Sequence, residues 1–130
     1  MSERFILEIG SLFNQIVKFF DDVINSVFIC FSRYFDFEGR SSRSEFWHWQ
    51  LFRVLLFLSL TFLETILFSG LNFTFNLFLL IPEISVSIRR LHDTNKSGLW
   101  YLLTFTIIGI IPLIYFYSLK GDETKNNYDY

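Results

Sequence analysis

The fold of this chain is decided by the stretch Arg89-Arg90-Leu91-His92-Asp93-Thr94-Asn95-Lys96-Ser97-Gly98, a dense polar block between two long apolar runs. The run before it, residues 71–88, holds a single charge at Glu83, and the run after it, residues 99–119, holds none. Such a pattern is typical of a loop at a membrane surface. We therefore expect the specific chemistry of the chain to lie in or near this block.

The composition also favours a membrane protein. Among 130 residues, 52% are hydrophobic, 21% are aromatic and 18 are Phe, more large apolar side chains than a small soluble domain could hide from water. The formal net charge of −2 provides no general attraction for nucleic acid. The single cysteine excludes an internal disulfide, and the first residues lack the basic region of a removable signal peptide.

Three transmembrane helices are predicted. They cover residues 46–68 (or 51–68), 71–88 and 99–119, with a tight turn at Ser69-Gly70 between the first two. Helices of about 18–23 residues, rising 1.5 Å per residue, cross a hydrocarbon core of about 30 Å. Kinks are expected at Pro82, Gly109 and Pro112.

An amphipathic helix precedes the spans. Over residues 5–31 apolar and polar side chains each recur at steps of three and four, which predicts a helix with a wide apolar face. Its polar face is net acidic, so attraction to anionic lipid would not hold it at a membrane surface. Its apolar face could contact lipid, the other helices of the chain, or a partner. The sequence thus predicts an all-α membrane protein with an arm (1–33), a three-helix membrane domain (34–121) and a polar tail (122–130).

Basic residues predict the orientation. They concentrate before the first span and in the polar block, whereas the Ser69-Gly70 turn has none. By the positive-inside rule the N-terminus and the block are cytoplasmic and the C-terminus is outside. Two interfacial aromatic belts are expected, one cytoplasmic with Trp47, Trp49, Trp100 and Tyr101, and one opposite with Tyr115 and Tyr117.

The polar residues before the first span and after the second should meet at one membrane face. The members of this expected cluster are Arg40, Arg43, Glu45, Arg89, Arg90, His92 and Asp93. Charges at this depth should pair or bind something ionic, and the guanidinium groups outnumber the carboxylates. Two interpretations follow: ion pairs that lock helix ends together, or a site for an anionic headgroup or ligand, because guanidinium binds phosphate well.

The pair His92-Asp93 is compatible with metal or catalytic chemistry, but the sequence does not favour either. A metal site needs further ligands, and His48 is the only other histidine. Adjacent residues rarely orient each other for a relay to Ser97 or Ser44. We therefore expect no catalytic residue, metal or cofactor. Asp93 would instead bond loop backbone or pair with Arg40 or Arg43, and Ser97 would cap the third helix.

Other polar residues lie within the predicted spans. Glu83 is expected to pair with Arg53 across the helices, and Glu64 is expected to reach the outer interface near the turn. Asn72 and Asn76 share a helix face and should hydrogen-bond locally. Structural roles are favoured for all of them.

The order of motifs resembles a known family. G-R-x-x-R-x-E-F-W at residues 39–47, R-R-L-H-D-x-x-x-S-G-x-W at 89–100 and a third span closing on Gly121 are similar to DUF805, small bacterial inner-membrane proteins, over about residues 34–128. The resemblance implies a multi-pass inner-membrane protein and no particular activity. Thr124 and Asp129 stand where the family has glycine. The resemblance assigns structural importance to Gly39, Trp47, Pro82, Ser97, Gly98, Gly121, Asn126 and Tyr128.

Two function classes remain. The favoured one is an interaction or scaffold protein with a basic cytoplasmic face. The alternative is a binder, or a transporter subunit, for an anionic lipid headgroup or small anionic ligand, although three helices are few for an independent transporter. The expected partners are the lipid bilayer, an anionic phospholipid, and a membrane-protein partner or a second copy, but not nucleic acid. The sequence contains no nucleotide-binding or catalytic motif that would predict an enzyme.

Overall fold

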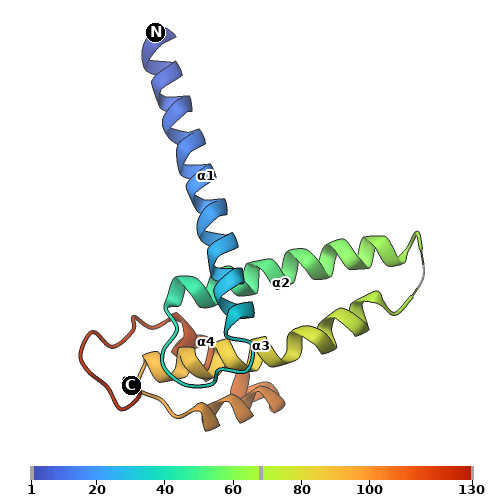
Figure 1. The fold of residues 1–130 in the computed structure, drawn as a ribbon, viewed down its shortest axis with the longest axis vertical. Helices are drawn as coiled ribbons and strands as arrows, with labels where there is room; N and C mark the ends of the chain where they lie inside the picture. The colour runs from blue at the N-terminus through green and yellow to red at the C-terminus, as the bar shows by residue number, and fades with distance from the viewer. Residues whose placement is uncertain (1, 68, 130) are drawn as a thin grey trace.

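The computed structural model describes residues 2–67 and 69–129, and this part of the chain is helical without strands. A long N-terminal helix crosses a hairpin of two helices, and two shorter helices pack on one side of it (Figure 1). The all-α prediction is confirmed. Phe68, the predicted end of the first span, and the termini Met1 and Tyr130 lie outside the described residues. The elements are α1 (Ser2–Ser32), α2 (Arg43–Glu64), α3 (Leu71–Asp93), the 3₁₀-helix η1 (Gly98–Phe105) and α4 (Ile107–Ser118).

Side chains cap backbone groups at the start of α2 and at the turn between α2 and α3. Ser42 accepts a hydrogen bond from the Glu45 N–H at 3.1 Å, the usual role of an N-cap serine. At the far turn, Glu64 accepts from the N–H groups of Gly70 (3.0 Å) and Asn72 (2.8 Å). Glu64 therefore lies at the turn, as predicted. Both helices are long and apolar enough to cross a membrane.

The third predicted span is not one continuous helix. Residues 99–119 are divided between η1 and α4 by Thr106, which is extended (φ −120°, ψ 136°) and caps α4 by accepting from the Gly109 N–H. The backbone at Gly109 approaches η1 so closely that a Cβ there would lie 2.5 Å from the Leu103 carbonyl oxygen. At 12 residues, α4 extends about 18 Å, less than a hydrocarbon core.

Both ends of this broken segment lie at the same end of the hairpin. η1 begins after the short loop 94–97 that follows α3, and a Cβ at Gly98 would lie 2.8 Å from Ile88, so η1 runs back along α3. After α4 the chain returns to the end of α3, where the Asp122 N–H donates to the Asp93 carbonyl at 2.8 Å. The prediction that the tail lies opposite the polar block is therefore wrong. The segment folds back because Thr106 and Gly109 permit a tight turn.

Only the last turns of α1 pack on the rest of the chain. Ser26 and Cys30 are buried, whereas every residue from Ser2 to Asp22 is exposed. The Ser26 hydroxyl lies 3.0 Å from His48 Nδ1, and the Phe31 ring meets Trp49 edge to face. Packing on the chain's own helices thus accounts for the last third of the arm alone.

The apolar core sits at the polar-block end of the hairpin. Trp49 is fully buried there, and the ring of Tyr117 packs on that of Phe46 at a tilt of 35°, with centroids 4.4 Å apart. The prediction that Tyr117 lies in a belt opposite that of Trp49 is therefore wrong, because the return of α4 brings Tyr117 to the start of α2. The core consists of Cys30, Phe46, Trp49, Leu79, Val86, Leu91, Leu113 and Tyr117.

Candidate functional site

A network of ion pairs centres on Asp93 at the end of α3. Its carboxylate, 12% exposed, binds Arg40 at 2.8 Å and also Arg90. Arg40 extends to Asp129 of the tail at 3.0 Å. Gly121 packs against the same carboxylate, and any Cβ there would collide with it. Asp93 thus connects the loop before α2, the end of α3 and the C-terminal tail.

Arg90 holds the end of α4. Its side chain is fully buried, and it donates to the carbonyl of Tyr117 at 3.1 Å and to that of Leu119. The last carbonyls of a helix lack intrahelical partners, and a cation near them also complements the helix dipole. Arg90 therefore acts as a C-terminal cap for α4 while its charge is balanced by Asp93.

Arg89 points into a different environment from its neighbour. It pairs with Glu45 of α2 at 3.0 Å and is fully buried. Its Nε and Nη2 atoms have no hydrogen-bond partner among the described residues. Cys30 lies close by, and burial raises the pKa of this thiol to about 12, so it stays protonated. The pair Arg89–Glu45 locks α2 to α3.

His92 is occupied by structural contacts. Its Nδ1 lies 3.0 Å from the Gly39 carbonyl oxygen, and its ring stacks on Tyr128 with centroids 3.9 Å apart and planes 3° from parallel. Asn126 donates to the His92 carbonyl at 2.9 Å. Over residues 2–67 and 69–129 no three His, Cys, Asp or Glu side chains are grouped as metal ligands would be.

The loop before α2 is positioned by backbone geometry. Gly39 has φ +74°, a conformation that L side chains rarely adopt, and the Ser41 N–H donates to the Arg89 carbonyl at 3.1 Å. Together these features direct Arg40 toward Asp93. Arg43, one turn further on, is exposed and has no ion pair among the described residues. The structure thus brings six of the seven predicted cluster residues into contacts and leaves Arg43 at the surface.

The charges of the tail contact stabilise one another. Burial by itself would lower the pKa of Arg40, but hydrogen bonds to Asp129 and Asp93 outweigh it and raise that pKa above its ordinary value. The Asn126 N–H and then Arg40 hold the pKa of Asp129 below its ordinary value. Asp129, which replaces a glycine of the family pattern, therefore takes part in the tail turn.

A second polar network lies deeper, around Glu83 on α3. The predicted pair with Arg53 is confirmed at 2.8 Å. Two further donors were not predicted: Trp49 Nε1 at 2.8 Å and Gln50 Nε2 at 2.9 Å. Their position in sequence gave a signal, because Trp49 and Gln50 precede Arg53 by one helical turn. Glu83 is thus a fully bonded carboxylate.

Two other local predictions are confirmed. Asn76 donates to the Asn72 carbonyl at 2.8 Å. Ser97 caps η1 by accepting from the Leu99 N–H at 3.3 Å, although the element it begins is a 3₁₀-helix and not a spanning helix. α3 continues as helix through Pro82.

Comparison with known proteins agrees with these motifs. The model of the family described as "Protein of unknown function (DUF805)" matches residues 34–130. This chain belongs to the DUF805 family. All of α1 precedes the match. Among relatives of this DUF805 member, inner membrane protein YhaI of Escherichia coli strain K12 is 35% identical over 99 residues, covering 73% of the chain and 84% of YhaI.

A second relative supports the same assignment. Inner membrane protein YhaH of the same strain is 30% identical over 103 residues, covering 73% of the chain and 85% of YhaH. No solved structure matches. The relatives are inner membrane proteins, and α2 and α3 have the length and hydropathy of membrane spans, so this DUF805 chain is consistent with an integral membrane protein.

Proposed function

We propose that this DUF805 protein is a membrane interaction protein whose helical hairpin anchors the α1 arm, and that the apolar face of the arm lies in the bilayer surface. The observation that carries this proposal is the exposure of α1 from Ser2 to Asp22. Its exposed apolar row includes Phe5, Ile9, Leu12, Phe13, Ile16 and Phe20. An exposed apolar row of this length marks a surface that contacts a membrane or another protein.

The direction of α1 supports the bilayer as that contact. α1 crosses the hairpin steeply and continues far beyond it (Figure 1). If α2 and α3 follow the membrane normal, α1 lies along the membrane plane. Its contacts to His48 and Trp49 place the crossing in the first two turns of α2, toward the polar end. That position is where an interfacial helix would lie.

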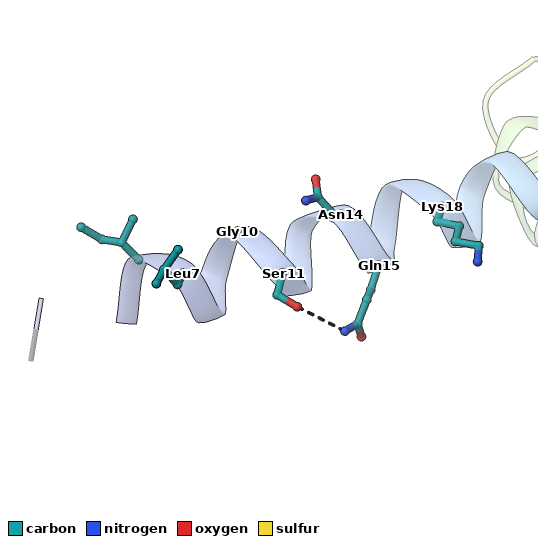
Figure 2. Close-up of a pocket in the computed structure, with 7 residues that line it drawn as sticks. Leu7, Gly10, Ser11, Asn14, Gln15 and Lys18 are labelled. Atoms are coloured by element: carbon teal, nitrogen blue, oxygen red, sulfur yellow. Dashed lines mark hydrogen bonds between the residues drawn. The ribbon is translucent and has the colours of Figure 1, made fainter. Parts of the chain in front are cut away.

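The free part of the arm has a polar face opposite its apolar row. Figure 2 shows Ser11, Asn14, Gln15 and Lys18 on this stretch, with Gln15 bonded to Ser11 at 3.5 Å. The shallow hollow there is lined by α1 residues alone. The arm carries more acidic than basic side chains, so its attachment would come from apolar burial, about 1.5–3 kcal/mol for each large side chain fully buried.

We further propose that the polar end of the hairpin, the arm and the tail are all cytoplasmic. The basic residues of the loop before α2, the polar block and the tail gather at this end, whereas the turn at Ser69-Gly70 has none. The positive-inside rule favours this orientation. The return of α4 to the end of α3 puts Lys120 on the same side as Arg40.

Site-directed spin labelling tests the placement of the arm. Single cysteines at Phe13, Asn14, Gln15 and Ile16 would be introduced into a Cys30→Ser background and reconstituted in vesicles. We expect labels at positions 13 and 16 to be accessible to oxygen, and labels at 14 and 15 to a water-soluble nickel chelate. Equal nickel access at all four positions would place the arm in water. A short label-to-label distance between chains would point to a second copy instead.

Headgroup binding by the arginine cluster as a whole is less well supported. Arg40, Arg89 and Arg90 each bind a carboxylate of the chain. Carboxylates of the chain therefore neutralise most of the positive charge that suggested an anion site. The cluster is better explained as ion pairs that hold the helix ends together. Arg43 is the exception.

A further inference from the structure

A groove lies between α2 and α4, beside the locked cluster. Its volume is about 370 Å³, and its walls include Trp47, Val54, Ile114 and Tyr117. Trp47 is 40% exposed, Val54 55% and Ile114 52%, so the groove opens sideways. For helices that span a membrane, that side is the acyl region of the bilayer.

A separate polar hollow lies at the start of α2, next to Asp93. This hollow, about 340 Å³, is lined by Arg43, Lys120 and Asp122 among others. Arg43, Trp47 and Val54 are separated by four and seven residues, so they lie on one face of α2. On the other wall Lys120 follows Tyr117 by three residues. α2 therefore contributes to both the groove and the hollow, and the chain that leaves α4 contributes to the hollow.

The groove contains an unsatisfied polar group. The Tyr117 hydroxyl is buried beside Ser87, and it forms no hydrogen bond of good geometry among the described residues. Its neighbour Ser87 donates to Glu83 at 3.4 Å, and Glu83 is already bonded by Trp49 and Arg53. Buried hydroxyls are usually bonded, so an acceptor supplied from outside the chain would complete this site.

The charges at the upper end leave a guanidinium available. Asp93 is matched by Arg40 and Arg90, whereas Arg43 is exposed without an ion pair in the described part of the chain. Lys120 pairs with Glu123, but both side chains are about three-quarters exposed (76% and 73%), so this pair holds Lys120 weakly. Asp122, in the same hollow, accepts from Thr124. A guanidinium at this level is suited to a phosphodiester.

We propose that this groove binds one diacyl phospholipid, with its phosphate at Arg43, an ester carbonyl accepting from Tyr117, and an acyl chain along Trp47, Val54 and Ile114. The dimensions agree: the eleven-residue separation of Arg43 and Val54 corresponds to about 16 Å along a helix, close to half of a hydrocarbon core of about 30 Å. Asp122 beside the phosphate position accommodates an ammonium headgroup as well as a neutral one. This inference does not depend on where α1 lies.

Native mass spectrometry of the full chain in detergent tests the proposal. The protein is stripped of lipid and titrated with phosphatidylglycerol or phosphatidylethanolamine. We expect one phospholipid retained per wild-type chain. Val54→Trp fills the groove and should abolish retention. Leu55→Trp adds a similar bulk at a neighbouring position of similar exposure outside the groove lining, and should retain lipid as the wild type does.

Two conservative variants keep the test decisive if Val54→Trp does not fold. Tyr117→Phe preserves the shape of the wall and removes the free hydroxyl, and Arg43→Met removes the guanidinium. Each should weaken retention about tenfold. Equal retention by both variants and the wild type would overturn the proposal. So would the binding of inorganic phosphate, lost in Arg43→Met, by a chain that retains no phospholipid.

Discussion

Gly121 rests directly on the carboxylate of Asp93: a Cβ at position 121 would lie 2.8 Å from Asp93 Cγ and 2.9 Å from Oδ1. This contact brings the start of the tail against the end of α3, where the Asp122 N–H also donates to the Asp93 carbonyl at 2.8 Å. The glycine singled out by the family resemblance is therefore required by a close approach. The consequences of this arrangement can be tested.

Substitution of Gly121 should destabilise the polar end. Gly121→Ala forces either Asp93 or the tail to move, because the space is filled. We expect a lower thermal midpoint in detergent and a loss of protection of the tail from proteolysis. Gly10→Ala is the matched control, since nothing lies within 4 Å of a Cβ there, and it should be neutral or stabilising by up to about 1 kcal/mol through helix propensity.

Buried Arg90 and exposed Arg43 should contribute differently to the free energy of unfolding. Arg90→Met removes the cap of α4 and one cation from Asp93, and we expect a loss of about 3–5 kcal/mol, as for breaking a buried ion pair. Arg43→Met removes an exposed cation that has no ion pair with residues 2–67 or 69–129, and it should cost less than about 1 kcal/mol. Reversible unfolding in mixed micelles measures both. Equal losses would show that burial does not decide the contribution.

Arg53 and Glu83 should be energetically coupled. Arg53→Met leaves Glu83 with Trp49 and Gln50 as donors, and Glu83→Gln leaves Arg53 without a counter-charge. Each single substitution leaves the other residue without its ion-pair partner. The loss of unfolding free energy in the double variant should therefore be smaller than the sum of the two single losses, by about 0.5–3 kcal/mol. A double-mutant cycle of unfolding free energies measures this coupling, and additivity would exclude a direct interaction.

Docking of the tail should depend on pH through Asp129. Its pKa is lowered in the folded state, first by the Asn126 N–H and then by Arg40, so the charged form stabilises docking. The contribution is complete above the ordinary aspartate pKa and is lost as the pH falls through the lowered pKa. A spin label at Asn127 in a Cys30→Ser background should be immobile at pH 7 and mobile in acid. With Asp129→Asn it should be mobile at both.

Topology reporters distinguish the return of α4 from a third crossing. Green fluorescent protein fused after Tyr130 should fluoresce, because the tail is proposed to be cytoplasmic. Alkaline phosphatase inserted between Ser69 and Gly70 should be active, because that turn is proposed to lie outside. An inactive fluorescent fusion with an active phosphatase fusion at the C-terminus would restore a three-span topology.

Much of the architecture could be predicted from local patterns. Hydropathy and helical periodicity are properties of short segments, and they located α1, α2 and α3. The pair Arg53–Glu83 followed from the same reasoning, since two unlike charges inside an apolar hairpin have few alternatives. The break at Thr106 was harder to predict, because residues 99–119 are apolar enough to span a membrane. The turn there depends on a close backbone approach at Gly109.

The sequence by itself determined that this is a helical DUF805 membrane protein, and which charged residues gather at one end of it. Both follow from local sequence, because the hydropathy of each segment and the two motifs that flank the hairpin depend on residues near one another in the chain. Only the tertiary structure decided that the tail returns to the end of α3, which carboxylates Arg40, Arg89 and Arg90 bind, and that Arg43 forms no ion pair in the described part of the chain. These outcomes depend on how elements far apart in sequence fit together, as Gly98 fits Ile88 and Gly121 fits Asp93.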